Sequence, residues 1–144
     1  MLNRRHLIIG STLLTLSPSF ASERVIVTDE EFKRIVGRKP KNRDPHHGYE
    51  YLLMTQGSKK LAYIGSYQKD DFERDDRFVV EPFRTGYLTY KRGYASYATE
   101  FREIYSRFEA NDISRRDADR RCGQLLGYTD SQIASFVGRS DGMR

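Results

Sequence analysis

Basic residues gather in one short segment that could bind anions. The stretch from Arg38 to Gly48, RKPKNRDPHHG, has two prolines and no larger apolar residue, so we predict a surface loop. The predicted binding residues are Arg38, Lys39, Lys41, Arg43 and the following Tyr49. Cationic side chains beside a tyrosine suit contacts with a protein or an anionic polymer. A solvated linker is the alternative.

Two adjacent histidines, His46 and His47, lie in the same segment and could ligate a metal. Imidazole nitrogens bind zinc, and Asp44 lies close by in the sequence. Neighbouring side chains do not readily face one ion, however, and no further ligand can be predicted. We therefore predict no metal site and no cofactor.

A tyrosine-rich stretch suggests a different chemistry. Tyr51 is followed by Tyr63-Ile64-Gly65-Ser66 and then by Arg74, a pattern that resembles the core of the GIY-YIG nucleases. The resemblance implies that two tyrosines, an arginine and a later glutamate surround one metal ion and the scissile phosphate. The residues that would fill these places are Tyr51, Tyr63, Arg74 and either Glu100 or Glu103. The alternative is a tyrosine-rich hairpin that packs on a helix.

The segment 127–140 resembles the turn region of helix-turn-helix DNA-binding domains. The resemblance rests on Gly127, Tyr128, Thr129, Gln132, Ile133, Ala134, Val137 and Ser140. It implies a second, groove-binding helix that would begin near Ser140. Because Arg144 follows so closely, we expect a plain helical hairpin instead, and nucleic acid is not the expected partner.

One amphipathic helix organises the elements that must position these residues. In the segment 93–111, apolar side chains recur every three or four residues, at Tyr94, Tyr97, Ala98, Phe101, Ile104, Tyr105 and Phe108. This spacing predicts a helix with one aromatic face. Such a face needs a surface to pack against.

The rest of the chain can supply that surface. We predict a β-hairpin from segments 49–55 and 60–67 and further strands at 78–80 and 86–90. Capping patterns at Thr28, Ser114 and Thr129 predict one helix before the sheet and two near the C-terminus. The predicted fold class is α+β, with a small antiparallel sheet packed against the long aromatic-faced helix and two shorter C-terminal helices. Cys122, the only cysteine, is expected in the core.

The composition fits one globular domain, and the N-terminus reads as an export signal. Of 144 residues, 38% are hydrophobic, which is enough for a core over residues 22–144. Residues 1–21 have a basic start, a short apolar run and small residues before Ser22, which predicts a cleavable signal. The pair Arg4 and Arg5 leaves the twin-arginine and general secretory routes open. We expect no transmembrane segment after cleavage, because the apolar run is too short to span a bilayer.

Charge and location together favour one function class. The formal net charge of +5 is a mild bias towards anionic partners. We expect an exported periplasmic protein with a non-catalytic binding or accessory role, contacting an envelope protein or an anionic polymer. The alternative is a small metal-dependent nuclease. The oligomeric state is left open.

Overall fold

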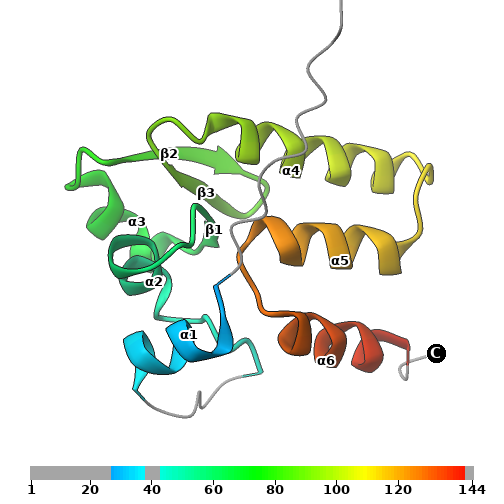
Figure 1. Ribbon diagram of the computed structural model, residues 1–144. Coiled ribbons are helices and arrows are strands. Elements are labelled where there is room, and N and C mark those ends of the chain that lie inside the picture. The colour runs from blue at the N-terminus through cyan, green and yellow to red at the C-terminus, as the bar shows by residue number, and fades with distance from the viewer. Residues whose placement is uncertain (1–26, 38–42, 142–144) are drawn as a thin grey trace, which may run out of the picture.

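The computed structural model describes residues 27–37 and 43–141. The predicted signal, residues 1–21, lies outside this part of the chain. The described part has an α+β fold, as the sequence predicts, with a three-stranded antiparallel sheet and six helices (Figure 1). The helices are α1 (Asp29–Val36), α2 (Glu50–Gln56), α3 (Ser66–Glu73), α4 (Ala95–Glu109), α5 (Arg115–Leu125) and α6 (Asp130–Asp141). The strands are β1 (Leu61–Ile64), β2 (Phe78–Phe83) and β3 (Gly86–Lys91).

The sheet has the order β1-β3-β2, with β3 in the centre. Strands β2 and β3 form a hairpin in which Phe83 pairs with Gly86, and β1 pairs with β3 from Leu61 opposite Tyr90. Gly86 is required at its position, because a Cβ atom there would lie 2.5 Å from the carbonyl oxygen of Ile64. Pro82 is tolerated in β2 because this strand is at the sheet edge.

The predicted hairpin of segments 49–55 and 60–67 is wrong. Segment 49–55 lies mostly in helix α2, the strand β1 is limited to Leu61–Ile64, and α3 begins at Ser66. The helix buries Glu50, Leu53 and Met54, whose spacing of three and one follows a helical face and not the alternation of a strand. In so short a segment, two tyrosines that alternate with other residues are compatible with the period of a helix as well as with that of a strand. The actual hairpin is β2–β3, built from the two later predicted strands.

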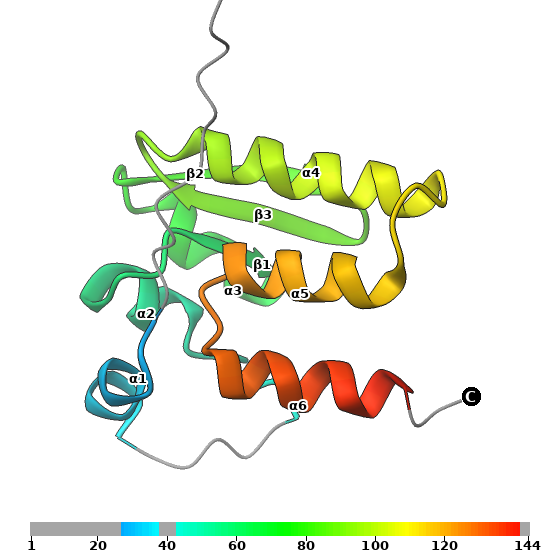
Figure 2. The same ribbon diagram turned by 45° about the vertical axis from the view of Figure 1, so that its right-hand side comes forward.

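The long aromatic helix is confirmed as α4, which packs on β3. It buries Tyr97, Ala98, Phe101 and Ile104 in a cluster with Leu88 and Tyr90 of β3 and with Ala118, Cys122 and Leu125 of α5. Figures 1 and 2 show α4, α5 and α6 stacked in that order, with α4 next to the sheet. Cys122 is therefore a core residue, as predicted, and burial raises the pKa of its thiol to about 12.

All three predicted helix caps are present, and at Thr129 the hydroxyl accepts a hydrogen bond from the Gln132 amide at 3.2 Å. The Thr28 hydroxyl accepts a hydrogen bond from the Glu31 amide at 3.1 Å, and the Ser114 hydroxyl accepts one from the Asp117 amide at the same distance. Gly37 ends α1 with a positive φ of 63°, a conformation that favours glycine. Helix α1 thereby presents Phe32 and Val36 to a small cluster with Leu53 of α2.

Candidate functional site

A buried polar centre, formed by His46, Lys59, Tyr128 and Gln132, connects the 43–49 turn to the C-terminal helices. The His46 ring is fully buried and stacks between Phe32 and Tyr128, with ring centroids 5.3 and 4.0 Å away. The Lys59 ammonium lies 2.9 Å from His46 Nδ1, and His46 Nε2 lies 3.2 Å from Gln132 Oε1. Because an ammonium only donates, Nδ1 accepts, and the ring carries its proton on Nε2.

Burial determines the charge states of His46 and Lys59 in this centre. Desolvation, followed by the charge of Lys59, lowers the pKa of His46 to about 2, so the folded ring is neutral. Burial lowers the pKa of Lys59 to about 8, and the carboxylates of Glu50 and Asp44 partly offset that effect. Lys59 also donates to the backbone carbonyl of Leu126. It is therefore a fully buried cation that is satisfied by hydrogen bonds from distant parts of the chain.

A pocket of about 250 Å³ lies beside this centre, between β1, α4, α5, α6 and the 43–45 segment. We call it the aromatic pocket, and its apolar walls are Tyr63, Phe101, Tyr105, Leu126, Ile133 and Phe136. Tyr63 and Phe136 are 38% and 49% exposed, although large apolar side chains are usually covered. Phe136, on α6, therefore lines the pocket and also contacts solvent.

The polar lining of the aromatic pocket has both signs of charge. Arg43 and Arg139 provide guanidinium groups, and Arg139 donates to the backbone carbonyl of Arg43. Asp44 is held by the Tyr128 hydroxyl at 2.7 Å. Asp119 Oδ2 is buried 3.7 Å from Arg115 Nε, which is too long for a hydrogen bond, and burial raises the pKa of this carboxyl group.

The predicted binding residues reach this region only in part. Arg38, Lys39 and Lys41 lie outside the described residues. Arg43, at the end of the predicted basic loop, lines the aromatic pocket. Tyr49 is partly buried and packs against the small cluster around α1 instead of facing solvent with the arginines.

The residues that would form the nuclease site are not brought together. Tyr51 packs with Ala62 and Ile64 on one face of the sheet, whereas Tyr63, which alternates with them along β1, contacts Phe83 on the other face. Arg74 lines a shallow depression together with Tyr51. Glu100 and Glu103 line a separate cavity along α4.

The chemistry around Tyr51 also differs from that of an activating tyrosine. Its hydroxyl donates to Asp75 Oδ2 at 3.0 Å, and this hydrogen bond is the main reason why the pKa of Tyr51 is raised. Asp75 itself is bound by the Arg77 guanidinium, which lowers the pKa of the carboxyl group. A tyrosine that donates to a stable carboxylate is harder to deprotonate, and this pair links α2 to the turn between α3 and β2.

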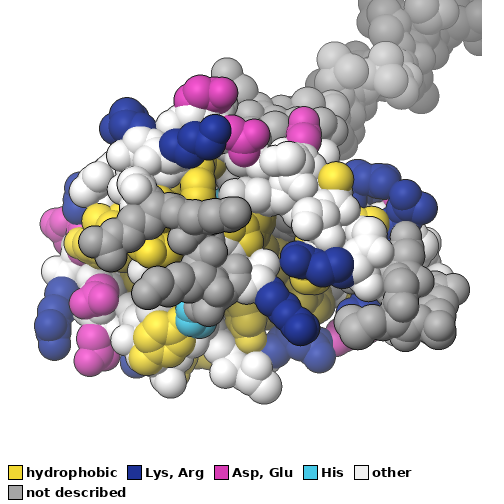
Figure 3. Space-filling model, turned by 90° about the horizontal axis from the view of Figure 1, so that it is seen from below, with side chains coloured by type: hydrophobic (Ala, Val, Ile, Leu, Met, Phe, Trp, Pro, Cys, Tyr) yellow, Lys and Arg dark blue, Asp and Glu magenta, His cyan; other side chains and the backbone are white. Residues whose placement is uncertain are grey.

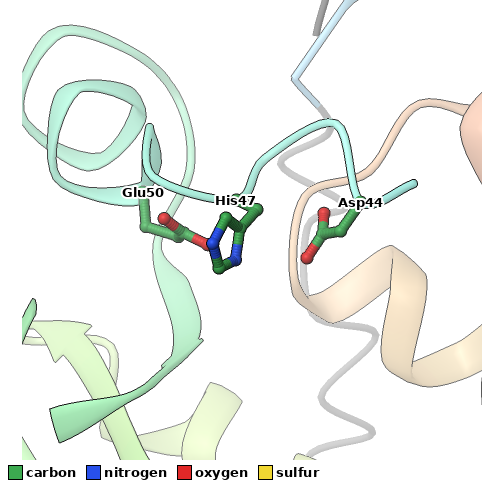
Figure 4. A group of neighbouring side chains, drawn as sticks. All are labelled: Asp44, His47 and Glu50. Atoms are coloured by element: carbon green, nitrogen blue, oxygen red, sulfur yellow. The ribbon is translucent and has the colours of Figure 1, made fainter. Parts of the chain in front are cut away.

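A second group of polar residues lies at the 43–50 turn, and the sequence revealed it only in part. Asp44, His47 and Glu50 each offer one ligand atom, and these atoms lie within 4.8 Å of one another (Figure 4). Asp44 and His47 were considered as ligands from the sequence, but Glu50 was assigned to a strand. Their even spacing of three residues is the signal that could have found the group.

Comparison with protein-family models, with curated proteins and with solved structures gave no match. Within the described residues, no helix combines the length and the apolar character needed to cross a bilayer. The function has to be argued from the residues of the site.

Proposed function

We propose that the protein is an exported, non-catalytic binding protein of the periplasm that holds an acidic segment of a partner protein. One large apolar side chain of the partner enters the aromatic pocket, and acidic residues beside it meet Arg43 and Arg139. The observation that carries this proposal is the pocket itself, whose walls include two of the exposed large apolar side chains, Tyr63 and Phe136. Its volume of about 250 Å³ suits one large side chain better than an extended ligand.

The charges around the aromatic pocket support an acidic partner. Of its two aspartates, Asp44 accepts a hydrogen bond from Tyr128, and Asp119 lies 3.7 Å from the cationic Arg115. The guanidinium of Arg139 keeps donors beyond the bond that it gives to Arg43, since a guanidinium has five N–H groups. Figure 3 shows Lys and Arg side chains next to hydrophobic ones on the face seen from below. Such a mixture attracts acidic segments and buries an apolar anchor.

Asp119 adds a feature that suits a peptide in particular. Its Oδ2 atom is buried without a hydrogen-bond partner among the described residues. A buried acceptor without a donor is costly, and a small displacement of the pocket wall on binding would let a backbone N–H of the bound segment reach it. A peptide could thus contribute an apolar side chain, acidic groups and an amide donor to one site.

Peptide binding tests the proposal directly. We expect the protein to bind a fluorescent peptide with one phenylalanine between pairs of glutamates, and to bind poorly when the phenylalanine is alanine or the glutamates are lysines. Fluorescence anisotropy would measure the affinities. Phe136→Ala and Arg139→Ala should each weaken binding about tenfold, the loss typical of an interface anchor.

Matched controls are available on other surfaces. Leu52→Ala removes another exposed apolar side chain, and Arg74→Ala removes another exposed arginine, so both should leave peptide binding unchanged. Arg74→Ala also separates the proposal from the nuclease alternative, in which it would abolish activity. Equal weakening by all four variants, or binding that ignores the phenylalanine, would refute the pocket as the binding site.

Export can be tested separately by cell fractionation. We expect the intact mass of the periplasmic protein to correspond to residues 22–144, because the predicted signal ends at Ala21. A cytoplasmic species that retains residues 1–21 would contradict the proposed location. It would not affect the peptide measurement, so the two parts of the proposal can fail independently.

A further inference from the structure

The group formed by Asp44, His47 and Glu50 has the composition of a metal site. One imidazole nitrogen and two carboxylate oxygens converge within 4.8 Å of one another. In Figure 4 the His47 ring lies between the two carboxylates, with one on either side. Imidazole and carboxylate are ligands that zinc accepts, at distances near 2 Å, so small side-chain rotations would bring three such atoms onto one ion.

The turn between α1 and α2 explains why these residues meet. The His47 amide donates to the Asp44 carbonyl at 3.2 Å, and the Tyr49 amide donates to the His46 carbonyl at 2.8 Å. Gly48 has a φ of +81°, which lets the chain reverse its direction before Glu50 begins α2. The three residues, spaced by three, therefore face the same side of a folded turn.

Each ligand is oriented by an outer hydrogen bond. Asp44 Oδ1 accepts from the Tyr128 hydroxyl and from the His46 amide, and Glu50 Oε2 accepts from Gln68 Nε2. The Tyr67 hydroxyl lies 3.3 Å from Nδ1 and 3.2 Å from Nε2 of His47, so it contacts the edge of the ring that carries both nitrogens. Such outer partners fix ligand geometry in metal sites. Neither carboxylate shows a hydrogen bond to its second oxygen from any described residue, so both keep an acceptor for an ion.

Burial and charge also point to a cation. Glu50 is only 4% exposed, yet its partner Gln68 is a neutral amide that does not compensate its charge. Lys59 is the nearby cation that interacts with both Glu50 and Asp44. Two carboxylates and one ammonium leave a net charge of −1. His47 and Asp44 are exposed and provide the path by which an ion can enter.

We propose that Asp44, His47 and Glu50 bind one zinc ion. Three protein ligands leave at least one coordination position for water. The site adjoins the aromatic pocket, because Asp44 also lines that pocket, whereas His47 and Glu50 do not.

Isothermal titration of the full chain with ZnCl₂, after removal of metal with a chelator, tests the proposal. We expect one zinc ion per protein and a thermal midpoint that rises with zinc concentration, because the ion binds the folded state. His47→Ala and Glu50→Gln should abolish this binding at zinc concentrations that saturate the unchanged protein. Glu50→Gln keeps the size of the side chain, and His47 is exposed, so both variants should fold.

The control is a carboxylate outside the group. Asp71→Asn removes an exposed acid from the cluster around Asp75 and Asp76 and should leave zinc binding unchanged. The absence of stoichiometric binding, or binding that survives in His47→Ala, would overturn the proposal. Circular dichroism of each variant without zinc establishes that a loss of binding is not a loss of fold.

Discussion

The aromatic core under α4 and the polar centre around His46 are both buried, but they are stabilised in different ways. In the core, Phe83, Phe101 and Tyr105 contact one another with ring centroids 5.2 to 5.8 Å apart. In the polar centre, Lys59 and His46 each depend on two hydrogen bonds to particular atoms. Apolar contacts tolerate small shifts, whereas a buried charge loses most of its compensation when one partner moves. The first region should therefore dominate stability, and the second should determine how stability responds to pH.

The largest expected effect is in the aromatic core. Phe101→Ala should lower the free energy of unfolding by about 3–5 kcal/mol, because it removes a ring that is 2% exposed and leaves a cavity. Urea denaturation measures this value. Phe136→Ala removes a half-exposed ring and is the matched control. It should lower the free energy of unfolding much less. Equal losses in the two variants would contradict the assignment of Phe101 to the core.

A smaller loss of stability is expected when the pH of the solution is lowered, through the His46 ring of the polar centre. The pKa of His46 is about 2 in the folded protein and near 6.5 when unfolded, so between these values the unfolded state binds more protons. The contribution of His46 to stability should be complete above pH 6.5 and should be lost as the pH drops below it, by up to about 1.4 kcal/mol per pH unit. Denaturation of metal-free protein at several pH values measures this slope.

Replacing His46 tests whether the polar centre, and not the aromatic core, determines how stability depends on pH. His46→Asn removes the titrating ring and should flatten the slope between pH 6.5 and 4.5. Phe101→Ala should lower stability at every pH without changing that slope. If the slope is the same in His46→Asn as in the unchanged protein, the acid response comes from other groups.

The smallest of these effects concerns the partner of His46. Lys59→Met keeps much of the side-chain volume but leaves His46 Nδ1 and the Leu126 carbonyl without their donor. We expect a loss of about 1–2 kcal/mol at pH 7, because two unsatisfied acceptors cost more than the burial of one charge regains. Thermal unfolding measures it. A more stable Lys59→Met protein would show that burying the ammonium is the dominant cost.

The contrast between the two regions also explains what the sequence could predict. The α4 helix was predictable because its pattern is long and regular, and the caps at Thr28 and Ser114 depend on residues three positions away. Segment 49–55 was mispredicted because seven residues do not distinguish a helix from a strand, and that error hid Glu50 from the candidate ligands. Arg43 was predicted as a binding residue from its place in the basic loop, and the pocket that it lines was not predicted.

The polar centre could not be predicted from the sequence for a different reason. His46 and Gln132 are 86 positions apart, and Lys59 and Leu126 are 67 apart. Local spacing carries no information about such pairs. Lys59 in particular looked like an ordinary turn residue, and only the folded chain shows it as a buried cation.

These long connections have a consequence for synthesis. Lys59 finds its carbonyl acceptor at Leu126, and His46 finds its amide partner at Gln132, both near the end of the chain. A nascent chain, or a fragment truncated before Leu126, would lack one of the two acceptors of the Lys59 ammonium and would keep only His46 Nδ1. The polar centre is therefore complete only after residues 126–132 have been made, and we expect a shorter product to be more sensitive to proteases.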